Sequence, residues 1–223
     1  MRIQNIIMGL VSLTLSISLI SCDAHDDHIL PPDTTMKVCD IVCTDGSVMR
    51  YDDFSKSGKT AEAVVFFVNH GDASHQGTGY AVCLHDIEEA TFADSLGVSQ
   101  GTSANVDSYD GNSNTYSLMN SRIYSPMANK VFGYMYDGQS AYIPSVAQMR
   151  LILGAKSSIN GYLALVGGTP LPTTSSKSWY WTSTEVEGQQ PLKAWLYSIE
   201  SGARLETNKL QEHKVRPIIT LYK

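Results

Sequence analysis

Residues 178–185 read Ser-Trp-Tyr-Trp-Thr-Ser-Thr-Glu. Because aromatic and β-branched residues are typical of β-strands, we expect a strand over Ser178–Ser183. Three more short strands are expected after it, and polar turns separate them: Lys193–Ser198, Ala203–Thr207 and Val215–Tyr222. The last third of the chain is therefore expected to consist of short consecutive strands.

The first part of the domain also favours strands. Val38–Cys43 and Val48–Tyr51 flank Thr44-Asp45-Gly46-Ser47. Asp-Gly between two apolar runs predicts a β-hairpin, because glycine tolerates the positive φ of a tight turn. Ala63–Asn69 is a nearly continuous apolar run, as expected for a strand covered on both faces, and Gly79–His85 is its expected partner.

Helices are expected in the middle of the chain. Thr115–Tyr124 and Pro126–Tyr136 carry apolar residues at three- and four-residue spacing. Ser145–Leu153 is the clearest helix, because its first residue can cap it, Gln148 stands at the capping-box position and Gly154 suits the C-terminal stop. We expect two to three helices here.

Strands at both ends and helices in the middle favour a mainly antiparallel sheet over a parallel βαβ sheet. Residues 94–115 are rich in Ser, Gly, Asn and Asp and predict a long surface loop. With no internal repeat and no second shift of composition, the sequence predicts one α+β domain over residues 37–223, including the N-terminal β-hairpin.

The composition excludes two broad classes of protein. The 223 residues include 16 Lys and Arg against 22 Asp and Glu, and the formal net charge is -6. An acidic chain lacks the basic patch with which a nucleic-acid binder replaces condensed counterions, so we expect no nucleic-acid partner. Hydrophobic residues make up 43% of the chain, which is too many for a mainly disordered protein.

Residues 1–21 have the pattern of a secretory signal. Arg2 precedes the mostly apolar stretch Ile6–Ile20, which is too short to span a bilayer comfortably. Leu19-Ile20-Ser21-Cys22 resembles a bacterial lipobox, which predicts lipidation of Cys22 and anchoring to a membrane. The alternative is a plain signal peptide followed by an accidental cysteine.

Residues 22–36 form an acidic, proline-containing stretch that predicts a short tether. Acidic residues directly after a lipidated cysteine resemble the export signals that take some lipoproteins of Gram-negative bacteria to the cell surface. A solvated spacer is the alternative interpretation of the same residues.

Three cysteines follow the tether, namely Cys39, Cys43 and Cys83. Three thiols allow at most one intramolecular disulfide, and their spacing is not a zinc signature. All three fall in expected strands, so burial as small hydrophobic side chains is the default interpretation. A disulfide with Cys83 stays open at this point.

Signals for catalysis are weak. His70 and His75 stand in a loop-like segment, and His85 ends an expected strand. Gly167-Gly168 lacks the lysine of a phosphate-binding loop, and the adjacent Glu88-Glu89 point in different directions on a helix or a strand. We therefore predict no enzyme, no cofactor and no metal. A deep pocket lined by one of these histidines and a carboxylate would favour an enzyme instead.

All three tryptophans lie in one C-terminal window, at Trp179, Trp181 and Trp195. Tryptophan offers a large contact area together with a hydrogen-bonding group, so it serves either a core or a binding surface. For Trp181 and Trp195 we favour the core, and ligand contact remains the alternative.

Several short motifs occur in a recognisable order. They are Asp110-Gly111, Asn114-Thr115, Ala141-Tyr142-Ile143-Pro144-Ser145, Gly167-Gly168-Thr169-Pro170-Leu171, Tyr180-Trp181-Thr182-Ser183-Thr184-Glu185, Ala194-Trp195, Gly202 and Lys214-Val215-Arg216-Pro217. Together they resemble the "major paralogous domain" group of bacterial surface lipoproteins, whose domain is a variant of the C-type-lectin-like fold. The resemblance covers most of residues 37–223.

The resemblance implies a structural motif and a binding surface between its pieces. Trp181 and Trp195 would cover the core from neighbouring strands, and Glu185 would pair with Arg216. Candidate ligand contacts then fall in the loops Glu187–Pro191 and Ser201–Gln211 and beside them. These candidates are Glu187, Gln189, Gln190, Glu200, Arg204, Asn208 and Gln211.

Two known properties of related proteins are not carried over. The calcium-and-sugar motif of C-type lectins is missing, since Gln190-Pro191 is followed by Leu192. Formylglycine-generating enzymes use cysteines in their C-terminal part, and here no cysteine follows Cys83.

The expected function is that of a non-catalytic binding or adhesion lipoprotein. We expect it to be lipid-anchored in the outer membrane of a Gram-negative bacterium and exposed at the cell surface, with an extracellular protein or glycan as its unidentified partner. The alternative is a structural or fimbria-associated subunit of an outer-membrane complex.

Overall fold

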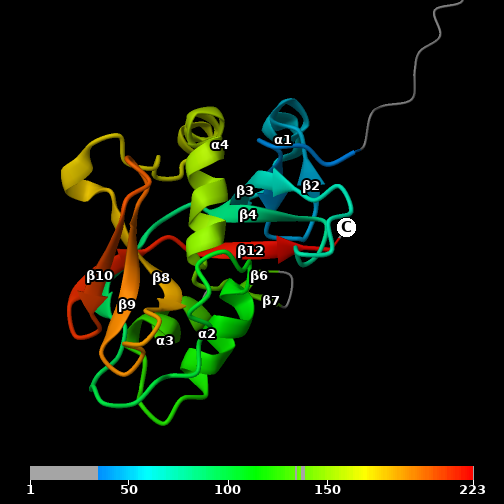
Figure 1. The fold of residues 1–223 in the computed structure, drawn as a ribbon. Coiled ribbons are helices and arrows are strands. Elements are labelled where there is room, and N and C mark those ends of the chain that lie inside the picture. Colours follow the sequence, from blue (N-terminus) through cyan, green and yellow to red (C-terminus); the bar gives the residue numbers. More distant parts are fainter. Residues whose placement is uncertain (1–34, 134, 137–138, 223) are drawn as a thin grey trace, which may run out of the picture. The chain divides into compact units, whose positions relative to one another are not determined.

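The computed structural model describes residues 35–133, 135–136 and 139–222, and these residues form a mixed α+β structure (Figure 1). The signal segment 1–21, the lipidation position Cys22 and most of the tether 22–36 lie outside the described residues. Besides a 3-10 turn at Ser175–Lys177, the described part contains four α-helices: α1 (Tyr51–Ser57), α2 (Gly111–Met119), α3 (Pro126–Phe132) and α4 (Val146–Leu165).

A five-stranded antiparallel sheet forms the centre of the fold, with the strand order β12-β4-β3-β1-β2. Its strands are β1 (Ile41–Cys43), β2 (Val48–Met49), β3 (Ala61–Val68), β4 (Gly79–Cys83) and β12 (Ile218–Leu221). Along β3, Val64 and Val65 belong to two different hydrophobic clusters, because successive side chains point to opposite faces. The central sheet is therefore covered on both faces, as the continuous apolar run of β3 predicts.

A second antiparallel sheet has the order β10-β9-β8 and is built from the C-terminal strands. These are β8 (Trp179–Glu185), β9 (Lys193–Ser198) and β10 (Arg204–Asn208). Two further strand pairs complete the described strands: β5 (Ile87–Thr91) with β11 (Glu212–Val215), and β6 (Met135–Tyr136) with β7 (Gln139–Ser140). The β-structure expected in the last third of the chain is confirmed.

Helix α4 lies against β3 of the central sheet and also contacts β8 and β9 (Figure 1). Its predicted capping box is present: Ser145 Oγ accepts from the Gln148 backbone N–H at 3.3 Å, and Gln148 Oε1 accepts from the Ser145 N–H at 3.0 Å. The predicted stop at Gly154 is wrong. The helix continues to Leu165 because its buried apolar stripe continues through Ile159 and Leu163, and this burial outweighs the modest cost of an internal glycine.

The predicted hairpin at Asp45-Gly46 is confirmed, since β1 pairs with β2 and Gly46 has φ of 82°. The strand expected to reach Tyr51 ends at Met49 instead, and the short helix α1 follows, which the sequence did not indicate. Gly58 ends that helix with φ of 69°. Its left-handed conformation is the usual helix stop.

Two other boundaries differ from the expectation. The predicted strand Val215–Tyr222 is divided between β11 and β12, because Pro217 has no N–H to donate to a ladder. Helix α2 begins at Gly111, inside the expected loop 94–115. A Cβ at Gly111 would lie 2.6 Å from the Ile143 carbonyl oxygen, so only glycine allows this close approach.

Candidate functional site

The two faces of the β10-β9-β8 sheet have different surroundings. In the strand register, Trp181 stands opposite Leu196, and Trp195 stands opposite Glu206. Because neighbouring residues in a strand point to opposite faces, Trp181 and Trp195 lie on different faces of the same sheet. We call these the Trp181 face and the Trp195 face.

The Trp181 face belongs to the core. The Trp181 side chain is fully buried, and its indole N–H donates to the Ala90 carbonyl oxygen at 3.1 Å. Phe92 and His213 contact its ring edge-to-face, at centroid distances of 5.5 and 5.4 Å. For Trp181 the core interpretation is therefore correct.

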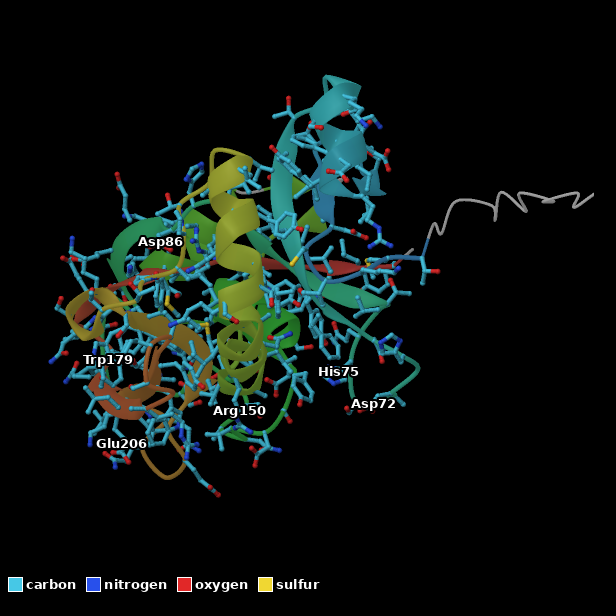
Figure 2. All side chains as sticks on the ribbon, turned by 90° about the horizontal axis from the view of Figure 1, so that it is seen from above. Asp72, His75, Asp86, Arg150, Trp179 and Glu206 are labelled. Carbon is cyan, nitrogen blue, oxygen red and sulfur yellow. The ribbon has the colours of Figure 1, made fainter. Side chains whose placement is uncertain are left out.

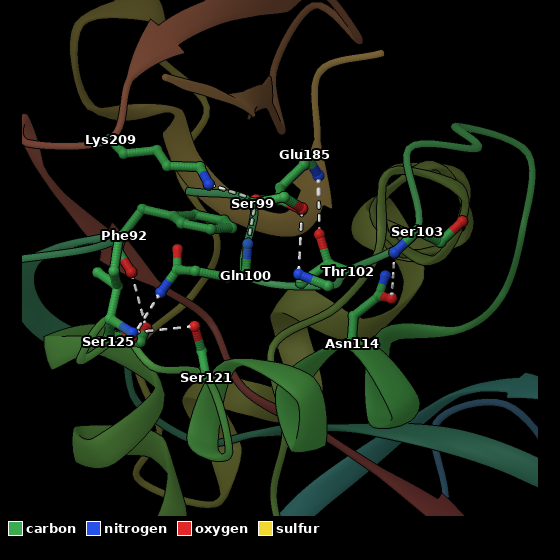
Figure 3. Close-up of polar contacts among 12 residues, drawn as sticks. Phe92, Ser99, Gln100, Thr102, Ser103, Asn114, Ser121, Ser125, Glu185 and Lys209 are labelled. Carbon is green, nitrogen blue, oxygen red and sulfur yellow. Dashed lines mark hydrogen bonds and ion pairs between the residues drawn. The ribbon is translucent and has the colours of Figure 1, made fainter. Parts of the chain in front are cut away.

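A buried charged residue, Glu185, ends strand β8 and holds a polar network together (Figure 3). Its carboxylate forms an ion pair with the fully buried Lys209. It also accepts hydrogen bonds from the Ser99 hydroxyl and the Gln100 backbone N–H, both at 2.9 Å. Burial lowers the pKa of Lys209, while the bond to Glu185 acts in the opposite direction. Glu185 thus fixes two loops to the end of β8.

The predicted pair between Glu185 and Arg216 is wrong. Arg216 is fully buried elsewhere, where its Nε lies 3.2 Å from Asp86 Oδ1 and its guanidinium donates to the carbonyl oxygens of Leu84 and Thr169. Each of the two buried charges is neutralised by an oppositely charged side chain, as buried ions require, but the partner is a different residue in each case. Both side chains are fully buried, which suits the structural role expected for them.

The Trp195 face is covered by α4 over part of its area and is open beyond it. Tyr197 packs in the cluster that includes α4, while Arg204 and Glu206 on β10 lie past the helix. The segment 104–107 stands opposite these strands, so a groove remains between them. Figure 2 labels one residue from each wall, Arg150 of α4 and Glu206 of β10.

This polar groove consists of two hollows, of about 520 and 420 Å³, which share three lining residues and are therefore continuous. The first is lined by Ala104, Asn105, Val106, Asp107, Val186, Glu187, Trp195, Arg204 and Glu206. The second is lined by Val106, Asp107, Arg150, Tyr197, Gly202 and Arg204. The volumes fall within the range of small-molecule sites.

The turn between β9 and β10 keeps one end of the groove open. Gly202 has φ of 75°, which favours glycine. A Cβ there would lie 3.2 Å from Leu153 Cδ2 and 3.5 Å from the Tyr197 hydroxyl oxygen. Ser198 stabilises the turn, since its hydroxyl accepts from the N–H groups of Glu200 and Ser201. The turn therefore leaves the hydroxyl of Tyr197 facing the second hollow.

Trp195 and Arg204 form the centre of the groove. The Arg204 guanidinium carbon lies 5.3 Å from the centroid of the Trp195 ring, a cation–π arrangement. The indole N–H of Trp195 is buried and has no hydrogen-bond partner among the described residues. Trp195 is half-buried against the core and also lines the groove, so ligand contact by Trp195 stays a prediction.

Of the seven candidate ligand residues, the structure brings Glu187 and Arg204 together in the groove. Gln189 lies beside it, donating to Glu206 at 3.3 Å. Asn208 accepts from the Leu210 N–H within the turn after β10, and its carbonyl accepts from Gln211. Gln190, Glu200 and Gln211 do not line the groove.

Among the groove residues that sequence reasoning missed are Asn105, Asp107, Arg150 and Tyr197. Arg150 Nη2 lies 3.0 Å from Asp107 Oδ1 and also donates to the Val106 carbonyl oxygen, so α4 holds the segment 104–107 in place. Arg150 and Tyr197 are far apart in sequence, and only the packing of α4 on the sheet unites them. No local pattern indicates that contact.

A second groove, the aromatic groove, lies between α2, α3 and β12 and measures about 530 Å³. Tyr116, Phe132 and Tyr222 in its walls are 71%, 54% and 58% exposed, whereas most aromatic side chains of the core are covered. Its lining is mainly apolar, in contrast to the polar groove.

None of His70, His75 and His85 lines either of the two grooves. His75 packs between Phe67 and Tyr109, at centroid distances of 4.4 and 3.8 Å, and burial lowers its pKa. His85 Nδ1 lies 3.0 Å from the Thr169 hydroxyl. In the described ranges, no group of three His, Cys, Asp or Glu side chains is arranged to hold a metal ion.

The disulfide left open by the sequence is not formed, since Cys39, Cys43 and Cys83 are free thiols. Burial raises the pKa of Cys83 to about 12, so its thiol stays protonated and unreactive. Cys43 and Cys83 serve as small buried side chains in the central sheet.

No protein-family model matches the chain, and a search of curated proteins found no match. Across the described residues, none of the helices combines the length and the hydropathy that crossing a bilayer requires.

Proposed function

We propose that the chain is a non-catalytic binding lipoprotein that is anchored through Cys22 at the cell surface and presents a C-type-lectin-like domain. The Trp195–Arg204 arrangement in the polar groove is the observation that carries this proposal. An aromatic ring and a guanidinium without an ion-pair partner, side by side in a hollow, are suited to holding a ligand rather than to stabilising the fold.

The groove overlaps in part with the loops in which the resemblance to surface lipoproteins leads us to expect binding. Trp181, Glu185 and Arg216 are buried, which suits a scaffold motif. The groove lies on the other face of the β10-β9-β8 sheet from Trp181 and contains Glu187 and Arg204 from the candidate loops. In this proposal the scaffold residues keep the sheet in shape, and the Trp195 face meets the partner.

A binding screen with matched variants tests the proposal. Full-length protein is screened against immobilised glycans and extracellular proteins, together with Arg204→Ala and Leu205→Ala. Leu205 is the matched control, because it follows Arg204 on β10, points to the opposite face and is exposed. We expect Arg204→Ala to lose binding and Leu205→Ala to keep it. Equal binding by both variants would remove the groove from the site.

The anchor is tested separately. We expect palmitate labelling of the wild-type protein and none of Cys22→Ala, and protease treatment of intact cells should degrade the wild-type domain. Labelling that persists in the variant would contradict the lipid anchor. Full protection from protease would place the domain inside the envelope.

The aromatic groove favours a second candidate function, a structural or fimbria-associated subunit. Exposed aromatic side chains in a hollow are typical of protein interfaces. A stoichiometric partner that copurifies from membranes, and is lost in Phe132→Ser but not in Tyr124→Ser, would support this function. Tyr124 is the control because it is equally exposed, at 53%, and does not line the groove.

A further inference from the structure

We propose that the second hollow of the polar groove is a carboxylate subsite, formed by Arg150, Arg204 and Tyr197, and that the ligand is a carboxylated saccharide. This inference rests on the proposed binding function and names the chemical class of its ligand. Two features of the hollow carry it: an excess positive charge, which the guanidinium of Arg204 supplies, and a hydroxyl without a partner.

The hollow brings together two cationic side chains from different elements. Arg150 comes from α4 and Arg204 from β10, and both line the same space of about 420 Å³. Asp107 is the one carboxylate in its lining, and it lies 3.0 Å from Arg150. The negative charge of Glu206, in the adjoining hollow, is neutralised by Lys193, whose Nζ lies 3.1 Å from Glu206 Oε2. One positive charge therefore remains in the second hollow.

Arg204 supplies that charge. Among the described residues, its guanidinium makes no hydrogen bond and no ion pair, and its contact is with the ring of Trp195. The cation–π contact keeps the guanidinium beside the Trp195 ring without using its N–H donors. A guanidinium held in this way suits a carboxylate, which accepts two parallel hydrogen bonds from it.

Tyr197 adds a donor at the floor of the hollow. The residue is only 2% exposed, yet no hydrogen bond to its hydroxyl is formed within the described part of the chain. The hydroxyl oxygen is not among the buried polar atoms without a partner, so it is reached from the hollow and is available to a ligand. Burial raises the pKa of Tyr197, and the positive charges of Arg150 and Arg204, which line the same hollow, act against that rise.

The first hollow indicates that a sugar carries the carboxylate. It adjoins the subsite through Arg204 and offers Asn105, Glu187 and the half-buried Trp195. Amide and carboxylate groups accept and donate in the pattern that sugar hydroxyls need, and an indole provides apolar contact area. A protein partner would need exposed apolar anchors, and such side chains surround the aromatic groove instead.

The test compares charged sugars with their neutral counterparts. Full-length protein, purified in detergent, is titrated with trigalacturonate and with its methyl ester, and also with sialyllactose and with lactose. Uronate and sialate sources are thereby separated, and each pair differs by the charged group. We expect binding of at least one carboxylated probe and about tenfold weaker binding, or none, of its neutral counterpart.

Variants connect the charge preference to the subsite. We expect Arg204→Gln and Arg150→Gln to weaken binding of the charged probe about tenfold or more, and Tyr197→Phe to weaken it about fivefold. Arg122→Gln is the matched control, since it removes the same charge from an exposed residue outside the groove. Thermal unfolding of each variant shows whether it is folded, and Tyr197→Phe keeps the buried ring.

Three outcomes would overturn the inference: equal affinity for charged and neutral probes, equal losses in Arg122→Gln and Arg204→Gln, or no binding of either carboxylated probe at about 10 mM. If a neutral glycan or a protein then binds and Arg204→Ala abolishes that binding, the proposed function stands while the carboxylate subsite fails. If no ligand depends on the groove, both fail.

Discussion

Trp181 and Trp195 are alike in sequence context and opposite in structural role. Both lie on neighbouring strands of the β10-β9-β8 sheet, yet Trp181 is sealed in the core with its N–H bonded to Ala90, while the N–H of Trp195 has no described partner. The difference follows from what packs against each face. Core elements cover the Trp181 face around Trp181 and leave only its edge at Leu205 exposed, whereas α4 covers the Trp195 face only in part.

The three-stranded sheet can therefore contribute to stability through one face and to ligand binding through the other. Burial of side chains on the Trp181 face fixes the strands in position. The side chains on the Trp195 face are therefore held in place although they are not needed for contacts within the core. Variants on the two faces should therefore separate stability from binding.

The largest effect is expected for Trp181→Ala. Truncation of a fully buried tryptophan removes its packing and leaves a cavity, and the Ala90 carbonyl loses its donor. We expect the free energy of unfolding to fall by about 3–5 kcal/mol, measured by urea denaturation. A loss below about 1 kcal/mol would contradict the core role of this face.

Glu185→Gln should have the next largest effect. The amide keeps the size of the side chain but leaves the buried Lys209 ammonium without a counter-charge. We expect a loss of about 3 kcal/mol in the free energy of unfolding. The double variant with Lys209→Met should recover part of it. An additive double variant would show that the two charges do not interact.

Trp195→Ala should cost about 1–2 kcal/mol of stability, because its side chain is only partly buried and makes no described hydrogen bond. Ligand binding should be lost at the same time. Circular dichroism and a binding titration on the same sample measure both quantities. A loss of stability as large as that of Trp181→Ala would abolish the distinction between the faces.

The smallest effect is expected from protonation of His213, which contacts Trp181, when the pH becomes acidic. Burial lowers the pKa of His213, so the unfolded chain binds a proton more readily than the folded one. Stability should therefore decline as the pH falls through about 6.5 toward the lower pKa of the folded state. His75 contributes in the same direction. Thermal melts of wild type and His213→Gln should diverge below this pH, and parallel curves would exclude His213.

The fold was predictable where local patterns decide it. The Asp45-Gly46 hairpin and the Ser145–Gln148 capping box each depend on residues that are close in sequence. Gly154 led to a wrong prediction of the end of α4, because a helix stop signal depends only on neighbouring residues. The helix continues beyond Gly154 because its later residues are buried against the facing sheet. Local signals therefore located the start of α4 and not its end.

The site was predictable only in part for the same reason. Glu187 and Arg204 were indicated because they stand near motif residues in the chain. Arg150 and Asp107 were not, since their position depends on how α4 and the segment 104–107 meet the sheet. The ion pairs of Glu185 and Arg216 were predicted wrongly. The charge of a residue does not show which oppositely charged residue the packing of the fold brings close to it.

The pairing of β12 with β4 has a consequence for biogenesis. Ile218 stands opposite Val82, so the central sheet stays incomplete until nearly the whole chain is available. Such long-range closure is slow and comes last in folding. We therefore expect the central sheet to be completed only after β12 has left the ribosome.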